Sequence, residues 1–124
     1  QAEAERAHEA LKERLAELEQ EARRDSDLAE ARARVQPGDR VAVFGIGGIG
    51  VNVLQTCRLQ QASRIIALDT DARRADLSYR FGATDFVAVP RGADRASTVA
   101  LVHALERRGV DAAIECSGAL TAGG

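Results

Sequence analysis

Residues 41–50 have the sequence VAVFGIGGIG, and this stretch decides the fold of the 124-residue chain. Its first four residues are apolar and predict a short buried strand. The glycines that follow fit the pattern GxGxxG and predict a tight turn, after which a helix is expected from about Ile49 to Gln60. A strand, a glycine turn and a helix in this order indicate an α/β domain with an anion site at the helix N-terminus.

The glycines of the turn have separate mechanical roles. Gly45 allows the chain to turn sharply out of the strand, and Gly50 lets the helix pack close to the sheet. Gly47 has no Cβ, so a pyrophosphate can approach the backbone closely. The phosphates then lie at free N–H groups, where the helix dipole favours negative charge.

Asp69 follows Gly50 by nineteen residues, at the end of the next predicted strand. This is the separation expected for an acid that accepts hydrogen bonds from ribose hydroxyls. Its charge repels a 2′-phosphate and therefore favours NAD over NADP. Arg73 and Arg74 would instead favour NADP, since a guanidinium can bind a phosphate. However, both residues begin a helix and can turn to solvent. We therefore predict NAD as the cofactor.

Two other interpretations of this pattern remain open. The glycines can serve only as a tight strand–helix junction, with Asp69 as a helix cap. The same scaffold can also hold another adenine ligand, such as FAD or S-adenosylmethionine.

The chain beyond Val35 alternates strands with helices. We predict further strands at 64–68, 85–89 and 110–115, and further helices at 71–81 and from Asp94 or Ser97 to about Arg108. Such alternation implies right-handed crossovers and hence an α/β, Rossmann-like parallel sheet of about four strands in the order 3-2-1-4, with flanking helices. The crevice at the carboxyl ends of strands one and four is then the point where a nucleotide binds.

The first 34 residues have a different composition. They contain eight of the ten glutamates and no glycine, proline or β-branched residue. This composition predicts an amphipathic helix whose apolar stripe consists of Ala4, Leu11, Leu15, Leu18 and Ala22.

Asp25-Ser26-Asp27 predicts a break in this helix, followed by a shorter helix to Arg34. The stripe either packs on the chain's own sheet, which we favour, or forms a coiled-coil seam with a second copy. The uniform composition also suggests an engineered or chimeric segment. We therefore divide the chain into a helical part, 1–34, and a partial NAD-binding domain, 35–124.

Five motifs follow one another in a fixed order. They are VQPGD at 35–39, VAVFGIGGIG at 41–50, ASRIIALD at 62–69, FGAT at 81–84 and GVDAAIE at 109–115. Together they resemble the coenzyme domain of medium-chain, zinc-type alcohol dehydrogenases, over about residues 31–124. The resemblance implies the NAD-binding Rossmann fold of an oxidoreductase.

The resemblance also implies roles for individual residues. It implies a pyrophosphate turn formed by Gly45, Gly47, Gly48 and Gly50. Ile49 would add a backbone amide, and Asp69 would hold the ribose. Arg74 matches a basic position beside the adenosine, and Cys116 and Ser117 match the stretch that borders the cofactor.

In this family the zinc ligands and the substrate pocket come mainly from a separate catalytic domain, which has no counterpart in this sequence. His8 and His103 lie on predicted helices and outside any metal-ligand cluster. We therefore expect a module that binds NAD weakly, binds no zinc and has no turnover alone. The rival hypothesis is an engineered scaffold in which cofactor binding is vestigial.

The overall composition excludes several classes of protein. A net charge of −2 offers no general attraction to nucleic acid or to an anionic membrane. We expect no signal peptide, and no apolar run approaches the roughly 20 residues that span a bilayer. Cys57 and Cys116 are far apart in the sequence and are expected to be reduced thiols of a cytoplasmic protein. A bare sheet edge or the N-terminal helix would allow a homodimer.

Overall fold

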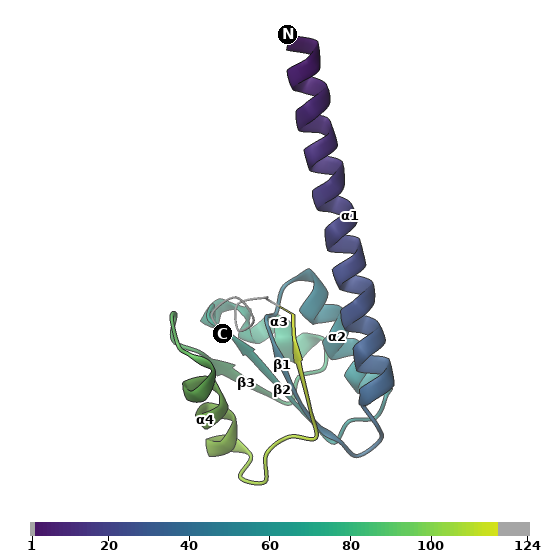
Figure 1. The fold of residues 1–124 in the computed structure, drawn as a ribbon. Coiled ribbons are helices and arrows are strands. Elements are labelled where there is room, and N and C mark those ends of the chain that lie inside the picture. Colours follow the sequence, from purple (N-terminus) through teal and green to yellow (C-terminus); the bar gives the residue numbers. More distant parts are fainter. Residues whose placement is uncertain (1, 117–124) are drawn as a thin grey trace.

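The computed structural model describes residues 2–116, which form a four-stranded parallel sheet with helices on both faces and one long helix that projects away from it (Figure 1). In chain order the elements are α1 (Ala2–Arg34), β1 (Arg40–Phe44), α2 (Gly48–Leu59), β2 (Arg64–Asp69), the 3₁₀ turn η1 (Ala72–Arg74), α3 (Ala75–Arg80), β3 (Asp85–Ala88), α4 (Arg95–Leu105) and β4 (Ala112–Glu115).

The strand order is β3-β2-β1-β4, and every neighbouring pair is parallel, which confirms the predicted order 3-2-1-4. The central strand β1 pairs on both sides, so that Val43 lies between Ala67 of β2 and Ile114 of β4. Parallel neighbours require crossover connections, which α2, α3 and α4 supply. The carboxyl ends of β1 and β4 therefore lie side by side where the strand order reverses.

Alternate residues of the strands pack in two separate apolar cores. In β1, Val41 and Val43 pack under α2 and the last turns of α1, whereas Ala42 and Phe44 pack under α4. Burial on both faces explains why the strand sequences are continuous apolar runs rather than alternating ones.

The ends of the crossover helices follow local sequence signals. The side chain of Asp94 accepts a hydrogen bond from the Ser97 amide (2.8 Å) and caps α4, so that Asp94 and not Ser97 is the cap of the two predicted candidates. Gly82 follows α3 with a φ of +121°, a left-handed backbone that favours glycine after a helix. The helix predicted at 71–81 is shorter than expected, because it begins with the 3₁₀ turn η1.

The predicted break in the N-terminal helix is wrong, because α1 is continuous through Asp25-Ser26-Asp27. Aspartate and serine favour helix caps, but strong helix formers surround them on both sides. Leu28 and Ala31 also pack against the domain and hold the last turns in helical form.

The expectation that the apolar stripe packs on the chain's own sheet is also wrong. Leu11, Leu15 and Leu18 are 58%, 50% and 42% exposed. α1 contacts α2 and β4 only near its carboxyl end, where Ala31 is fully buried. The remainder of the helix extends into solvent (Figure 1).

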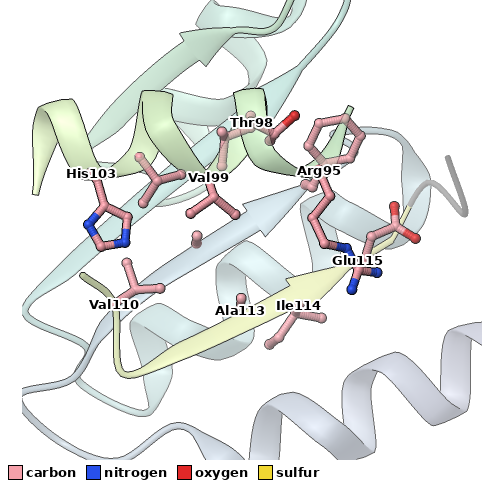
Figure 2. Close-up of a pocket in the computed structure, with 12 residues that line it drawn as sticks. Arg95, Thr98, Val99, His103, Val110, Ala113, Ile114 and Glu115 are labelled. Atoms are coloured by element: carbon pink, nitrogen blue, oxygen red, sulfur yellow. The ribbon is translucent and has the colours of Figure 1, made fainter. Parts of the chain in front are cut away.

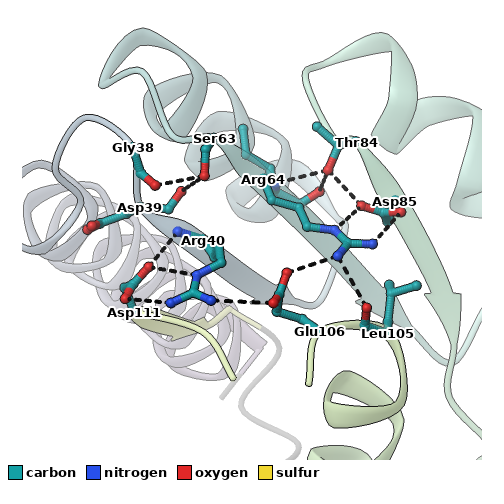
Figure 3. Close-up of polar contacts among 11 residues, drawn as sticks. Gly38, Asp39, Arg40, Ser63, Arg64, Thr84, Asp85, Leu105, Glu106 and Asp111 are labelled. Carbon is teal, nitrogen blue, oxygen red and sulfur yellow. Dashed lines mark hydrogen bonds and ion pairs between the residues drawn. The ribbon is translucent and has the colours of Figure 1, made fainter. Parts of the chain in front are cut away.

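Ion pairs join the amino ends of the strands (Figure 3). Arg40 of β1 pairs with Asp111 (3.2 Å) and with Glu106 (3.3 Å). Arg64 of β2 pairs with Asp85 (2.9 Å) and with the same Glu106 (2.9 Å). Hydrogen bonds from Arg64 lower the pKa of the Asp85 and Glu106 carboxyls, and those from Arg40 lower the pKa of Asp111. Glu106 thus links two strands at the end of the sheet opposite the glycine turn.

Candidate functional site

In the glycine turn between β1 and α2, the backbone at the end of the strand lies very close to the backbone of the first helical turn. Gly45 has a φ of +96° and donates its N–H to the carbonyl oxygen of Leu68 in β2 (2.8 Å). A Cβ added at Gly50 would overlap the carbonyl oxygen of Gly45. The fold itself therefore requires glycine at both positions, whatever the turn binds.

Within the described part of the chain, residues 2–116, no side chain caps the N-terminus of α2. Gly47 precedes the helix in an extended conformation, and the first turn contains no acid. Val51 donates the first helical hydrogen bond, to the carbonyl of Gly47 (2.9 Å). The N–H groups of Gly48, Ile49 and Gly50 consequently have no acceptor within the helix. Together with the helix dipole, these amides form a candidate anion-binding site.

Among residues 2–116, the space in front of the turn is open. A Cβ at Gly48 would meet no described atom within 4 Å, and a Cβ at Gly47 would meet only the Arg74 guanidinium, at 3.4 Å. The fold therefore tolerates side chains at these two positions, unlike at Gly50. Their absence leaves the backbone amides accessible, which is the arrangement that a diphosphate needs.

Asp69 fastens the loop after β2 to the glycine turn. The residue is 6% exposed; Oδ2 accepts a hydrogen bond from the Ile46 amide (2.7 Å) and Oδ1 accepts one from the Asp71 amide (2.9 Å). Because a carboxylate oxygen can accept about two hydrogen bonds, Oδ1 keeps capacity for a ribose hydroxyl. The residue that caps the following turn is Asp71, which accepts from the Arg73 amide (3.0 Å), and not Asp69.

Arg74 lies over the glycine turn. Its guanidinium donates to the carbonyl of Ile46 (2.9 Å) and pairs with Asp69 (3.4 Å). The Arg74 side chain is 44% exposed, but a carbonyl and a carboxylate hold its guanidinium over the turn. Arg73 does turn to solvent: its side chain is 90% exposed and pairs with Asp71 (3.0 Å).

These groups line one cavity of about 430 Å³ at the carboxyl ends of the strands. Eight of the nine residues selected from the sequence line it, namely Gly45, Gly47, Gly48, Ile49, Gly50, Asp69, Arg74 and Cys116. The ninth, Ser117, lies outside the described residues.

Sequence reasoning missed Phe44, Thr70, Asp71 and Arg91, which also line the cavity. Arg91 is exposed and has no ion pair within residues 2–116. All four residues end a strand or closely follow one. The rule that ligands bind at the carboxyl ends of parallel strands is the signal that points to them.

Cys116 lies at the end of β4, where burial raises the pKa of its thiol to about 12 and the charges of Asp27 and Glu115 add to the effect. Burial also raises the pKa of Cys57, in the core under α2, to about 11. Both thiols therefore stay protonated at neutral pH and are poor nucleophiles and metal ligands. The described residues contain no group of three or more His, Cys, Asp or Glu side chains that could hold a metal ion, so we assign none of them to zinc.

A second cavity, of about 410 Å³, lies between α4 and β4 (Figure 2). Its lining is mostly apolar and includes Val99, which is 47% exposed. Apolar walls fit side chains rather than a phosphate, so we assign the nucleotide site to the glycine turn. Among the helices of residues 2–116, none has the length and apolar character needed to cross a bilayer.

A parallel sheet in the order β3-β2-β1-β4 with a glycine turn before α2 defines a Rossmann-like domain. Residues 48–122 match the family model described as zinc-binding dehydrogenase, and the chain belongs to this family.

Over 86 residues the chain is 46% identical to S-(hydroxymethyl)glutathione dehydrogenase of Escherichia coli, an alignment that covers 69% of this chain and 23% of that protein. Two solved structures share the fold. An alcohol dehydrogenase zinc-binding domain protein from Burkholderia ambifaria has a TM-score of 0.65 and 28% identity over 77% of this chain and 25% of its own. Benzyl alcohol dehydrogenase from Acinetobacter calcoaceticus has a TM-score of 0.62 and 27% identity over 77% of this chain and 26% of its own. The chain thus spans about a quarter of the length of these relatives.

Proposed function

We propose that this domain binds NAD in the cavity at the glycine turn. The observation that carries the proposal is the uncapped N-terminus of α2 beside the Asp69 carboxylate. The amides of Gly48, Ile49 and Gly50 would receive the pyrophosphate, and Oδ1 of Asp69 would accept a ribose hydroxyl. Similarity to dehydrogenases favours a nicotinamide dinucleotide over other adenine ligands.

The same geometry supports a preference for NAD over NADP. A 2′-phosphate would approach the Asp69 carboxylate, which is fixed by two backbone amides and cannot move away. Arg74, one of two arginines that line the cavity, is already held by Asp69 and by the carbonyl of Ile46. Its charge is therefore less available to a phosphate than that of a free arginine.

When bound, the nicotinamide would supply the group that accepts or donates a hydride, while the chain's own residues bind and orient the cofactor. We propose weak binding, with a Kd on the order of 0.1–1 mM, and no turnover by this chain alone. In support of weak binding, Asp69 and Arg74 are already engaged in hydrogen bonds that hold the turn together. We also propose a cytoplasmic location, since both cysteines are free.

A second candidate function is that of a scaffold in which the nucleotide site is vestigial. The observation that favours it is that Asp69 and Arg74 already bond to the protein itself. The glycines and the acid would then serve the strand–helix junction alone. An engineered or chimeric N-terminal segment, with the division at residues 34 and 35, belongs to this second proposal.

Calorimetric titration of NAD and NADP against two matched variants distinguishes the two proposals. Gly48→Glu fits the fold, because a Cβ there meets no atom, but it brings a carboxylate to the anion site. Gln55→Glu adds the same charge at an exposed position further along the same helix, outside the cavity lining.

If the domain binds NAD, the wild type and Gln55→Glu bind NAD more tightly than NADP, and Gly48→Glu binds NAD about tenfold more weakly. Equally weak signals from all three proteins and both nucleotides would support the vestigial scaffold instead.

A further inference from the structure

The apolar stripe of α1, formed by Ala4, Leu11, Leu15, Leu18 and Ala22, has no partner within residues 2–116. Its three leucines are between 42% and 58% exposed, on a helix that extends beyond the domain (Figure 1). An isolated helix is only marginally stable in water, and packing of an apolar face is its usual source of stability. A stripe of this spacing is typical of a helix that packs on another helix.

The stripe lies on the opposite side of α1 from the surface that packs on the domain. Ala31, which is fully buried, marks the centre of that packed surface. At about 100° per residue, Leu15 lies about 160° from Ala31 around the helix axis, and Leu18 about 140°. The chain's own domain therefore cannot cover the stripe, whereas a second helix can approach it without meeting the domain.

We propose that two copies of this chain associate through their α1 helices in an antiparallel, two-stranded coiled coil. The stripe fits a heptad register in which Leu11 and Leu18 occupy position d and Leu15 occupies position a. In an antiparallel pair each a residue faces a d residue of the other copy. With the two-fold axis between residues 16 and 17, Leu15 faces Leu18, Leu11 faces Ala22 and His8 faces Asp25 of the second copy.

The charges beside the stripe favour this register. Position e faces e, and position g faces g, of the second copy. Lys12 then faces Glu19, and Arg14 faces Glu21. Neither glutamate has an ion pair within the described chain, so both are free to make one between copies. Because of the two-fold symmetry each pair occurs twice, so that Lys12, Arg14, Glu19 and Glu21 of both copies all face a residue of opposite charge.

Other arrangements of the same two helices bring like charges together. A shift of the antiparallel register by one heptad places Lys12 against Lys12 and Arg14 against Arg14. A parallel coil places Asp25 against Asp25 in the seam. Both cost free energy that the proposed register avoids.

Sedimentation of the 124-residue chain over about 1–300 µM tests the association. The wild type is expected to shift from monomer to dimer over this range, and Leu15→Glu is expected to stay monomeric. Leu15 lies outside the domain core, so circular dichroism should show that the variant keeps the fold. Leu59→Glu is the matched control, since Leu59 is an exposed leucine (82%) on α2 and should leave the dimer intact. A wild type that stays monomeric throughout, or a Leu15→Glu variant that dimerises equally well, would overturn the proposal.

A charge exchange tests the orientation. Arg14→Glu and Glu21→Arg should each weaken dimerisation about tenfold, because each places like charges face to face. The double variant should recover wild-type affinity, since the pair forms again with its charges exchanged. In a parallel coil Arg14 would face Glu19, so the double variant would stay weak, and that result would refute the antiparallel register. Because the seam does not include the glycine turn, either outcome leaves the proposal of nucleotide binding unaffected.

Discussion

At the scale of single residues, Asp27 is a carboxyl group whose buried surroundings disfavour its charge. It lies where α1 meets the domain, is 9% exposed, and its Oδ2 has no hydrogen-bond partner among residues 2–116. Burial raises its pKa, and the charges of Glu30 and Glu115 raise it further, against an opposing effect of Arg23. Because the pKa in the folded state lies above its unfolded value, the protonated form stabilises the fold. That stabilisation is present at low pH and is lost as the pH rises through the folded pKa.

We therefore predict that Asp27→Asn increases the free energy of unfolding at pH 7 by about 1 kcal/mol. The increase should shrink toward about pH 3, below the unfolded pKa of an aspartate, as the wild-type carboxyl takes up a proton. Urea denaturation at the two pH values measures both. Glu13→Gln, an exposed position on the same helix, is the control and should change neither value. Equal stability of Asp27→Asn and the wild type at pH 7 would show that the burial of Asp27 carries no cost.

At the scale of elements, the ion pairs at the amino ends of the strands join segments that are far apart in the sequence. Glu106, just after α4, contacts Arg40 of β1 and Arg64 of β2 (Figure 3). The pKa values of Asp85, Glu106 and Asp111 are lowered, so the folded state binds their protons less well than the unfolded chain does. Their stabilisation is therefore present above the unfolded pKa and is lost as the pH falls through the lowered values.

We predict that Glu106→Gln lowers the urea midpoint at pH 7, since two guanidinium groups lose a shared carboxylate. The difference from the wild type should shrink below about pH 4, as the wild-type carboxyl takes up a proton. A midpoint that is unchanged at pH 7 would mean that the bridge between β1 and β2 does not contribute to stability.

Elements whose signals are local could be predicted from the sequence. The cap at Asp94, the apolar run of β1 and the glycine turn each depend on a few adjacent residues. The continuity of α1 could not be predicted, because the local preference of Asp25 and Ser26 for a cap is overridden by packing further along the helix. The position of Arg74 could not be predicted either, since its partner Ile46 lies 28 residues away.

At the scale of the whole molecule, the strand order follows from right-handed crossovers and therefore could be predicted from the alternation of strands and helices. The position of the candidate site could also be predicted, because the carboxyl ends of parallel strands lie at the same edge of the sheet. Arg91, as a further lining residue, could not be predicted in this way, because its position depends on the shape of the loop after β3. The direction of α1 could not be predicted either, because it depends on which face of the helix packs on the domain (Figure 1).

We propose that the free amides in the first turn of α2 bind the phosphates of a nucleotide. Titration of ¹⁵N-labelled chain with ADP, followed through the backbone amide signals, tests it most directly. Saturable shifts are expected, the largest at Gly47, Gly48, Ile49 and Gly50, with the amides of α4 unchanged. The claim would be contradicted if those four signals stayed in place at millimolar ADP, or if the largest shifts occurred on α4.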